Sequence, residues 1–167
     1  MLTQQEIDGA LAFDNVGCTT CHSGPDFTDH GFHNIGVTSA TSSGALGRAG
    51  AYDVLALDEF SPTGRYSDDP EAGVRLYGDL SRASQDLGAF KTPSLRGVGQ
   101  RRRYMHDGSF GSLEDVLEFY TERGAATGGY FAGDVSGDAD AMFITSEQQR
   151  DIIAFMRTLD CEVDVKR

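Results

Sequence analysis

The chain has 167 residues, of which 39% are hydrophobic, and a formal net charge of −12 at pH 7. This length predicts one compact domain over residues 1–167, and the composition is typical of a folded protein with many loops. The negative charge argues against binding to nucleic acid, and a basic protein partner fits this chain better. No apolar stretch is long enough for membrane insertion.

The first predicted element is a helix that begins after Thr3. The Thr3 hydroxyl can cap this helix while Glu6 reaches back to the Thr3 backbone, which is the pattern of a capping box. Apolar side chains follow at helical spacing, namely Ile7, Ala10, Leu11 and Phe13. No leader of a signal peptide precedes the helix, so we expect such a peptide to lie outside this sequence.

A C-x-x-C-H motif follows, formed by Cys18, Cys21 and His22. Two thiols at this spacing reach the vinyl groups of a porphyrin while the imidazole binds the iron, so the motif predicts one covalently attached haem c with His22 as proximal ligand. The alternatives are half of a zinc site and a redox dithiol. Zinc needs a second pair of ligands, whereas the only other cysteine is Cys161, and a dithiol does not require the histidine. We expect Cys161 to be an unpaired thiol without a function.

The middle of the chain, residues 38–89, has a weaker pattern that is rich in Gly, Ser, Asp and Pro. Within it we predict one short helix, at about 71–80. We interpret the rest as long loops wrapped over the haem, because a covalently held cofactor can organise backbone that has little core of its own. No alternation of polar and apolar residues is strong enough to predict a sheet.

A further helix is predicted from about Leu113 to Arg123. Ser112 is its N-cap, Asp115 lies three residues later, and Gly124 ends it. Apolar side chains at Leu113, Val116, Leu117 and Tyr120 share one face. This segment is therefore an amphipathic helix with one face in the core.

The last predicted helix begins at Thr145 or Ser146. Its apolar stripe consists of Ile152, Ile153, Phe155, Met156 and Leu159. In small c-type cytochromes the first and last helices cross through a small residue and an aromatic residue, and Gly9 with Phe13 against Phe155 matches that crossing. The predicted fold class is thus all-α, a class I cytochrome c-like domain with long loops around one covalently bound haem.

Three segments occur in order along nearly the whole chain: Cys18–Gly36 (CTTCHSGPDFTDHGFHNIG), Gly88–Arg96 (GAFKTPSLR) and Tyr104–Tyr120 (YMHDGSFGSLEDVLEFY). Together they resemble the C-terminal haem domain of the bacterial dihaem cytochrome c peroxidases and of their relative MauG. The resemblance implies a periplasmic protein in which peroxide reacts at an N-terminal haem domain, while the C-terminal domain stores and passes electrons. Electron transfer is therefore the predicted function, and a peroxidase that reacts with hydrogen peroxide at this or a partner haem is the alternative.

The resemblance also implies a distal ligand. In the peroxidases a methionine lies fourteen residues after the histidine of the motif that corresponds to YMHDG, whereas MauG has a tyrosine there, and here the position is Tyr120. A phenolate would stabilise ferric iron and lower the reduction potential relative to a thioether. Helical periodicity equally fits Tyr120 as a core aromatic residue, and Met105 and Met142 are the alternative ligands of the iron.

Other residues are candidates for contacts with the haem or for catalysis. Pro25 occupies the place where cytochromes c offer a backbone carbonyl to the proximal imidazole. Lys91 and Arg96 are either partners of the haem propionates or ordinary surface cations. His106 and Asp107 are the candidates for acid–base catalysis.

The chain departs from the family in two places. The family commonly has a Thr-x-Pro stretch whose carbonyls help to bind calcium between the domains, whereas this chain has Arg101, Arg102 and Arg103, which would repel calcium unless only carbonyls face it. The chain also has a single C-x-x-C-H motif and no tryptophan. A second haem would have to come from a redox partner protein or from an N-terminal haem domain that this sequence lacks.

Overall fold

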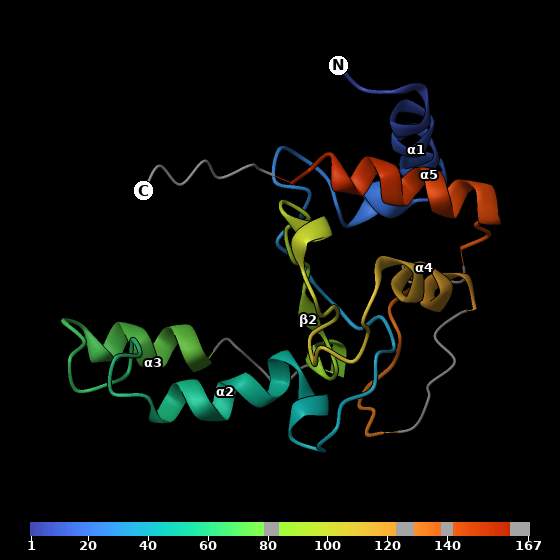
Figure 1. Cartoon of the computed structure of the whole chain (residues 1–167). Helices are drawn as coiled ribbons and strands as arrows, with labels where there is room; N and C mark the ends of the chain where they lie inside the picture. The colour runs from blue at the N-terminus through green and yellow to red at the C-terminus, as the bar shows by residue number, and fades with distance from the viewer. Residues whose placement is uncertain (79–83, 123–128, 138–141, 161–167) are drawn as a thin grey trace. The chain divides into compact units, whose positions relative to one another are not determined.

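The computed structural model is mainly helical, with one small sheet (Figure 1). The residues that it describes are 1–78, 84–122, 129–137 and 142–160. The chain divides into two compact units: 1–31, 92–125 and 137–167 form the first, and 32–91 and 126–136 form the second. Among the described residues, no helix is long and apolar enough to cross a membrane. The prediction of one domain over residues 1–167 stays a prediction.

Helices α1 (Gln4–Asn15) and α5 (Ser146–Arg157) of the first unit each begin with a capping box. The Thr3 hydroxyl accepts a hydrogen bond from the amide of Glu6 at 3.3 Å, and the Glu6 carboxylate accepts one from the amide of Thr3 at 2.6 Å. Thr145 caps α5 in the same way. Both predicted helix starts are confirmed, because a capping box depends only on residues three positions apart.

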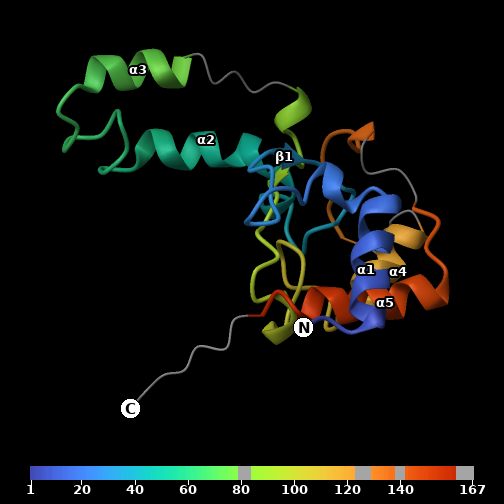
Figure 2. The same ribbon diagram turned by 90° about the horizontal axis from the view of Figure 1, so that it is seen from above.

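The two helices cross at Gly9, where α1 lies against α5 (Figure 2). A Cβ atom at Gly9 would overlap the carbonyl oxygen of Asp151 and lie 3.0 Å from the Cβ of Phe155. The rings of Phe13 and Phe155 pack edge to face, with their centroids 5.5 Å apart. The predicted crossing is confirmed, and it depends on the absence of a side chain at residue 9.

The buried face of α1 is narrower than the sequence predicts. Gly9, Ala12 and Phe13 are buried, whereas Ile7 is 40% and Leu11 is 59% exposed. Helical spacing alone therefore does not identify the buried face of α1, because the close approach at Gly9 decides which face meets α5. The buried stripe of α5 is as predicted, with Ile152, Ile153 and Met156 in the core.

Helix α4 (Leu113–Thr121) completes the helical part of the first unit. Ser112 is its N-cap and forms a capping box with Asp115, as predicted. The predicted end of this helix, at Arg123 and Gly124, lies outside the described residues, as does Cys161. The core of the unit includes residues of α1, α4 and α5 and of the loops between them, among them Leu95, Val98, Leu117, Ile144 and Leu159.

The second unit contains a short antiparallel sheet and two helices. Strands β1 (Phe32–His33) and β2 (Phe90–Lys91) pair with Phe32 opposite Lys91. The sequence predicted no sheet, because strands of two residues are too short to show an alternating pattern. Helices α2 (Arg48–Leu57) and α3 (Pro70–Gly78) run side by side (Figures 1 and 2).

Only one of these two helices was predicted. The prediction of a helix at about 71–80 matches α3, which has proline at its first position, although Leu80 lies outside the described residues. Helix α2 was missed, because Gly47 provides no side-chain cap and apolar residues such as Val54 and Leu57 are exposed. The sequence of α2 therefore lacks the apolar stripe at helical spacing that would have predicted a helix.

The capping box of α4 makes stability depend on pH. The Ser112 hydroxyl and the amides of Gly111 and Ser112 hold the pKa of Asp115 below its usual value. The stabilisation is therefore present above the unfolded-state pKa and is lost as the pH falls through the lowered folded-state pKa. We expect Asp115→Asn to lower the melting temperature at pH 7 but to differ less from the parent at about pH 3. Calorimetry at both pH values checks this, with Glu118→Gln as control, and a difference that does not depend on pH would contradict it.

Candidate functional site

The C-x-x-C-H motif forms a tight turn directly after α1. Cys18–Thr20 is a 3-10 turn, and the amide of His22 donates to the carbonyl of Cys18 at 2.9 Å. Gly17 precedes the turn with a φ of +94°, which favours glycine. Burial, with a smaller contribution from the charge of Cys21, raises the pKa of the Cys18 thiol to about 11. A thiol with a raised pKa is unlike the activated thiolates of redox dithiols, which argues against that alternative.

The imidazole of His22 is oriented by the backbone carbonyl of Phe27. The His22 Nδ1 lies 2.9 Å from this oxygen. With its proton on Nδ1, the imidazole has a lone pair on Nε2 that can bind a metal ion. The sequence predicted the carbonyl of Pro25 in this role, but that oxygen instead accepts two hydrogen bonds from Arg96. The residue that orients the imidazole is two positions further along the loop, and the sequence analysis missed it.

Phe27 presents its carbonyl from an uncommon backbone conformation. Its φ is +51°, which costs a residue with a side chain about 1–3 kcal/mol and persists only where the surroundings hold it. Its ring packs edge to face on Phe13 and Phe155, with centroids 6.5 and 6.0 Å away. The guanidinium carbon of Arg96 lies 5.1 Å from the ring centroid on the surface side. The contacts that fix Phe27 therefore come from three distant parts of the sequence.

The two cations proposed as propionate partners lie in different units. Arg96 is exposed in the first unit, and its guanidinium donates from Nε at 3.0 Å and from Nη2 at 2.6 Å to the Pro25 oxygen. Lys91 is exposed in β2 of the second unit. Their contact with propionates stays a prediction, and Arg96 has a role within the protein that the sequence did not reveal.

Tyr120, the predicted distal ligand, lies in the last turn of α4. Burial of its hydroxyl raises the pKa of the phenol well above its usual value, and the charges of Cys18 and Cys21 raise it further. The phenol is therefore neutral near pH 7. The effect of both thiols is consistent with a position of Tyr120 near the C-x-x-C-H motif, which fits a ligand and a core aromatic residue equally, so its role as distal ligand stays a prediction.

The alternative methionine ligands have different surroundings. The amide of Met142 donates to the carbonyl of Tyr120 at 3.1 Å, and its side chain packs on the core of the first unit. Met142 therefore lies beside the predicted ligand. Met105 is half-buried and has a φ of +65°. Neither observation assigns a methionine to the iron.

The loop that contains His106 and Asp107 lies near the start of α4. Burial lowers the pKa of His106, and the charge of Asp107 opposes this, so the imidazole is mainly neutral at pH 7. Asp107 accepts a hydrogen bond from the amide of Ser109 at 3.0 Å.

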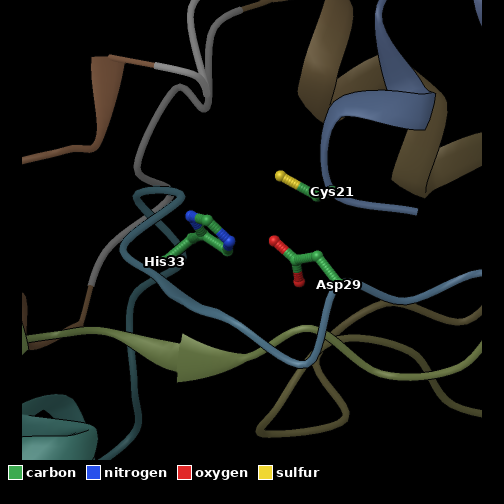
Figure 3. Close-up of side chains that lie close together, drawn as sticks. All are labelled: Cys21, Asp29 and His33. Carbon is green, nitrogen blue, oxygen red and sulfur yellow. The ribbon is translucent and has the colours of Figure 1, made fainter. Parts of the chain in front are cut away.

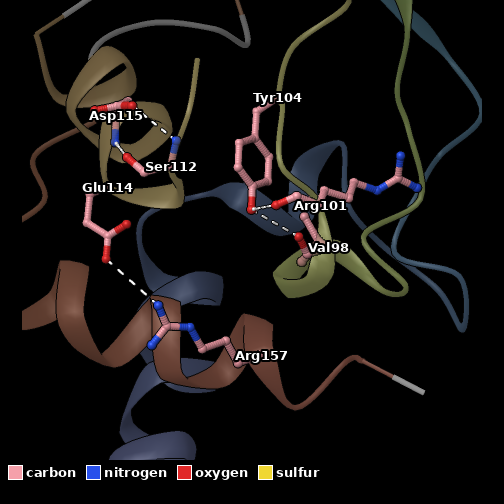
Figure 4. Close-up of polar contacts among 7 residues, drawn as sticks. All are labelled: Val98, Arg101, Tyr104, Ser112, Glu114, Asp115 and Arg157. Atoms are coloured by element: carbon pink, nitrogen blue, oxygen red, sulfur yellow. Dashed lines mark hydrogen bonds and ion pairs between the residues drawn. The ribbon is translucent and has the colours of Figure 1, made fainter. Parts of the chain in front are cut away.

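The hydroxyl of Tyr104 lies 3.2 Å from the Val98 carbonyl and 3.0 Å from the Arg101 carbonyl (Figure 4). The Arg101 carbonyl thus already has a partner, which adds no support for calcium in this stretch.

Asp29 is a residue near the motif that the sequence analysis did not single out. Its amide donates to the carbonyl of Cys21 at 2.7 Å, and its carboxylate lies within 4.8 Å of the Cys21 sulfur (Figure 3). The same carboxylate accepts a hydrogen bond from the amide of Gly31 at 2.8 Å. His33, which Figure 3 also draws, belongs to the second unit. The sequence signal for Asp29 is its position before His-Gly, which is typical of a local turn.

Comparison with known proteins identifies relatives for nearly the whole chain. The methylamine utilization protein MauG of Methylorubrum extorquens is 33% identical over 153 residues, which are 92% of this chain and 33% of that protein. The cytochrome-c peroxidase IdrP1 of Pseudomonas sp. (strain SCT) is 30% identical over 159 residues, or 94% of this chain and 40% of that protein. The chain therefore spans between a third and two fifths of the length of these curated relatives. No family model matches it.

Solved structures have the same fold. A MauG-like protein associated with microbial copper homeostasis matches with a TM-score of 0.64 and 26% identity, over 97% of this chain and 45% of that one. The diheme peroxidase BthA from Burkholderia thailandensis matches with a TM-score of 0.61 and 20% identity, over 97% of this chain and 44% of that one. At that identity the second likeness concerns the fold alone.

Proposed function

This chain belongs to the family of MauG and the cytochrome-c peroxidases, and we propose that it is a haem c electron-transfer domain of the C-terminal type, with one haem attached to Cys18 and Cys21. The observation that carries the proposal is the orientation of His22, which directly follows Cys21 in the motif: its Nδ1 lies 2.9 Å from the Phe27 carbonyl, which leaves Nε2 for a metal. A bound haem would supply reversible one-electron chemistry at its iron. The protein supplies attachment, two axial side chains and the surroundings that set the reduction potential.

The proposed roles rest on a contact for His22 and on the sequence for the other residues. His22 is the proximal ligand, because the Phe27 carbonyl holds its Nδ1 and leaves Nε2 for a metal. Tyr120 is the distal ligand, in agreement with its offset of fourteen residues from His106. A haem held by both side chains would transfer electrons and would leave no open position for a substrate at the iron. Arg96 and Lys91 remain the proposed partners of the propionates.

A second candidate function is a haem peroxidase that reacts with hydrogen peroxide at this or a partner haem. The observation in its favour is the lowered pKa of His106, since a neutral imidazole can accept a proton at pH 7. This function would need Tyr120 to leave the iron, or a second haem in a partner. We prefer electron transfer, because it requires neither of these two conditions.

The proposed partner is a second haem domain or a redox protein with a basic docking surface, which would complement the net charge of −12. The proposed location is the periplasm, because c-type haem is generally attached outside the bacterial cytoplasm. Both proposals go beyond what this chain can show by itself, because it spans between a third and two fifths of the length of its curated relatives.

Substitution of Tyr120 by phenylalanine tests the distal ligand. We expect the ferric holoprotein to lose its phenolate-to-iron charge-transfer band and to change its electron paramagnetic resonance spectrum, because phenylalanine has no donor atom. Optical and paramagnetic resonance spectra of the purified protein measure both. Tyr104→Phe is the matched control, since the Tyr104 hydroxyl is held by backbone carbonyls. An unchanged spectrum in Tyr120→Phe, with a thioether band that disappears in Met142→Leu, would assign the iron to Met142 instead.

A further inference from the structure

A short segment, 94–96, is bonded to the loop that follows the C-x-x-C-H motif. Arg96 donates two hydrogen bonds, of 3.0 and 2.6 Å, to the carbonyl of Pro25. Ser94 donates one of 2.6 Å to the next carbonyl, that of Asp26. The Ser94 oxygen also accepts from the amide of Arg96 at 3.1 Å, which links the two donors. Segment 94–96 therefore holds two consecutive carbonyls of this loop.

The next carbonyl along the loop, that of Phe27, is the one that meets Nδ1 of His22, at 2.9 Å. Its direction depends on the positive φ of Phe27, which the surroundings have to maintain. Arg96 contributes here too, because its guanidinium lies over the Phe27 ring at 5.1 Å. Each of the three consecutive carbonyls thus has a side-chain partner. Two of these partners, Ser94 and Arg96, belong to segment 94–96.

We propose that Ser94 and Arg96 are positioning residues for the proximal ligand. By holding the carbonyls of Pro25 and Asp26, they fix the direction in which the Phe27 carbonyl meets His22. The inference rests on the proposed function, since it takes His22 as a ligand of the haem iron. A hydrogen bond from Nδ1 makes the imidazole a stronger donor, which favours ferric over ferrous iron and lowers the reduction potential. Release of the loop is therefore expected to raise the potential.

The direction in which the reduction potential changes distinguishes loss of the positioning hydrogen bonds from loss of the Arg96 charge. A positive charge near the haem favours the ferrous state, so removal of the Arg96 charge would lower the potential. Arg96→Lys keeps the charge but cannot donate from two nitrogen atoms in one plane. Ser94→Ala changes no charge at all and removes the hydrogen bond to Asp26. A rise of the potential in these two variants cannot come from a change of net charge.

The experiment is a spectroelectrochemical titration of the holoprotein with Arg96→Lys and with Ser94→Ala. We expect the ratio of reduced to oxidised protein at a fixed potential to rise about tenfold in each, which is about 59 mV for one electron. Proton NMR of the reduced protein is expected to show a shifted and faster-exchanging Nδ1 proton of His22. Arg102→Lys and Ser109→Ala, which change exposed residues, are the controls and should leave both measurements unchanged.

An unchanged or lowered potential in both variants, with an unshifted Nδ1 proton, would overturn the inference while leaving the proposed function intact. A failure of the proposed function has a different signature. It would show as a His22→Gly holoprotein that keeps the spectrum of the parent, which would overturn both. Because Ser94→Ala is a small change at a partly exposed site, it gives a result even if Arg96→Lys matures poorly.

Discussion

Replacement of Gly9 by alanine is expected to lower the free energy of unfolding of the first unit by about 3 kcal/mol, at the upper end of the usual cost of overpacking. The new methyl group would overlap the Asp151 carbonyl oxygen, which belongs to the backbone of α5 and cannot rotate away. Alanine has the higher helix propensity, by about 1 kcal/mol, so the expected loss runs against the local preference of the helix. The crossing of α1 and α5 would have to open to accept the substitution.

Urea denaturation of the Gly9→Ala variant measures this loss. Gly111→Ala is a suitable control, because a Cβ atom there would meet only the Asp115 carboxylate, at an ordinary 3.8 Å. We expect the control to change stability by less than about 0.5 kcal/mol. If Gly9→Ala were as stable as the parent, the helices would not pack at this glycine.

The double substitution Cys18→Ser with Cys21→Ser is expected to abolish covalent attachment of haem. A hydroxyl does not form the thioether bonds to the vinyl groups that the C-x-x-C-H motif provides. Extraction with acidified acetone, followed by mass spectrometry of the protein, measures the bound fraction. Because His22 is retained, some haem can still bind without a covalent bond, and extraction would then remove it.

Cys161→Ser is the matched control for this prediction, since Cys161 is the remaining cysteine and is expected to have no role. It should keep its full complement of attached haem. A double variant that retains haem after extraction would contradict the assignment of Cys18 and Cys21. Loss of haem in the control would contradict the expectation for Cys161.

The parts of the fold that the sequence predicted are those that local patterns determine. The caps at Thr3 and Ser112 depend on residues three positions apart and are confirmed, as is the start of α5 at Thr145 or Ser146. Helix α2 begins without such a cap and has exposed apolar side chains, so it escaped prediction. Strands β1 and β2 are defined by their pairing with each other in the second unit. A strand of two residues leaves no alternating pattern in the sequence from which it could be predicted.

The candidate site shows the same division. The C-x-x-C-H motif is contiguous, so a local pattern is enough to recognise it, whereas its attachment to haem and the ligand role of Tyr120 stay predictions. The acceptor of the His22 proton was predicted at the wrong residue. Its identity depends on the positive φ of Phe27, which in turn depends on Phe13, Phe155 and Arg96. No local pattern reveals a conformation that residues so far apart in sequence maintain.

The pairing of α1 with α5 also has a kinetic consequence. The two helices are separated by about 130 residues, and closing a loop of that length costs about 4 kcal/mol of chain entropy before any packing is gained. Before the chain folds at the site where haem is attached, α1 therefore has no partner until α5 is present as well. The C-x-x-C-H motif, which directly follows α1, stays accessible for just as long, so the order of the chain itself provides a period in which haem can be attached before the first unit closes.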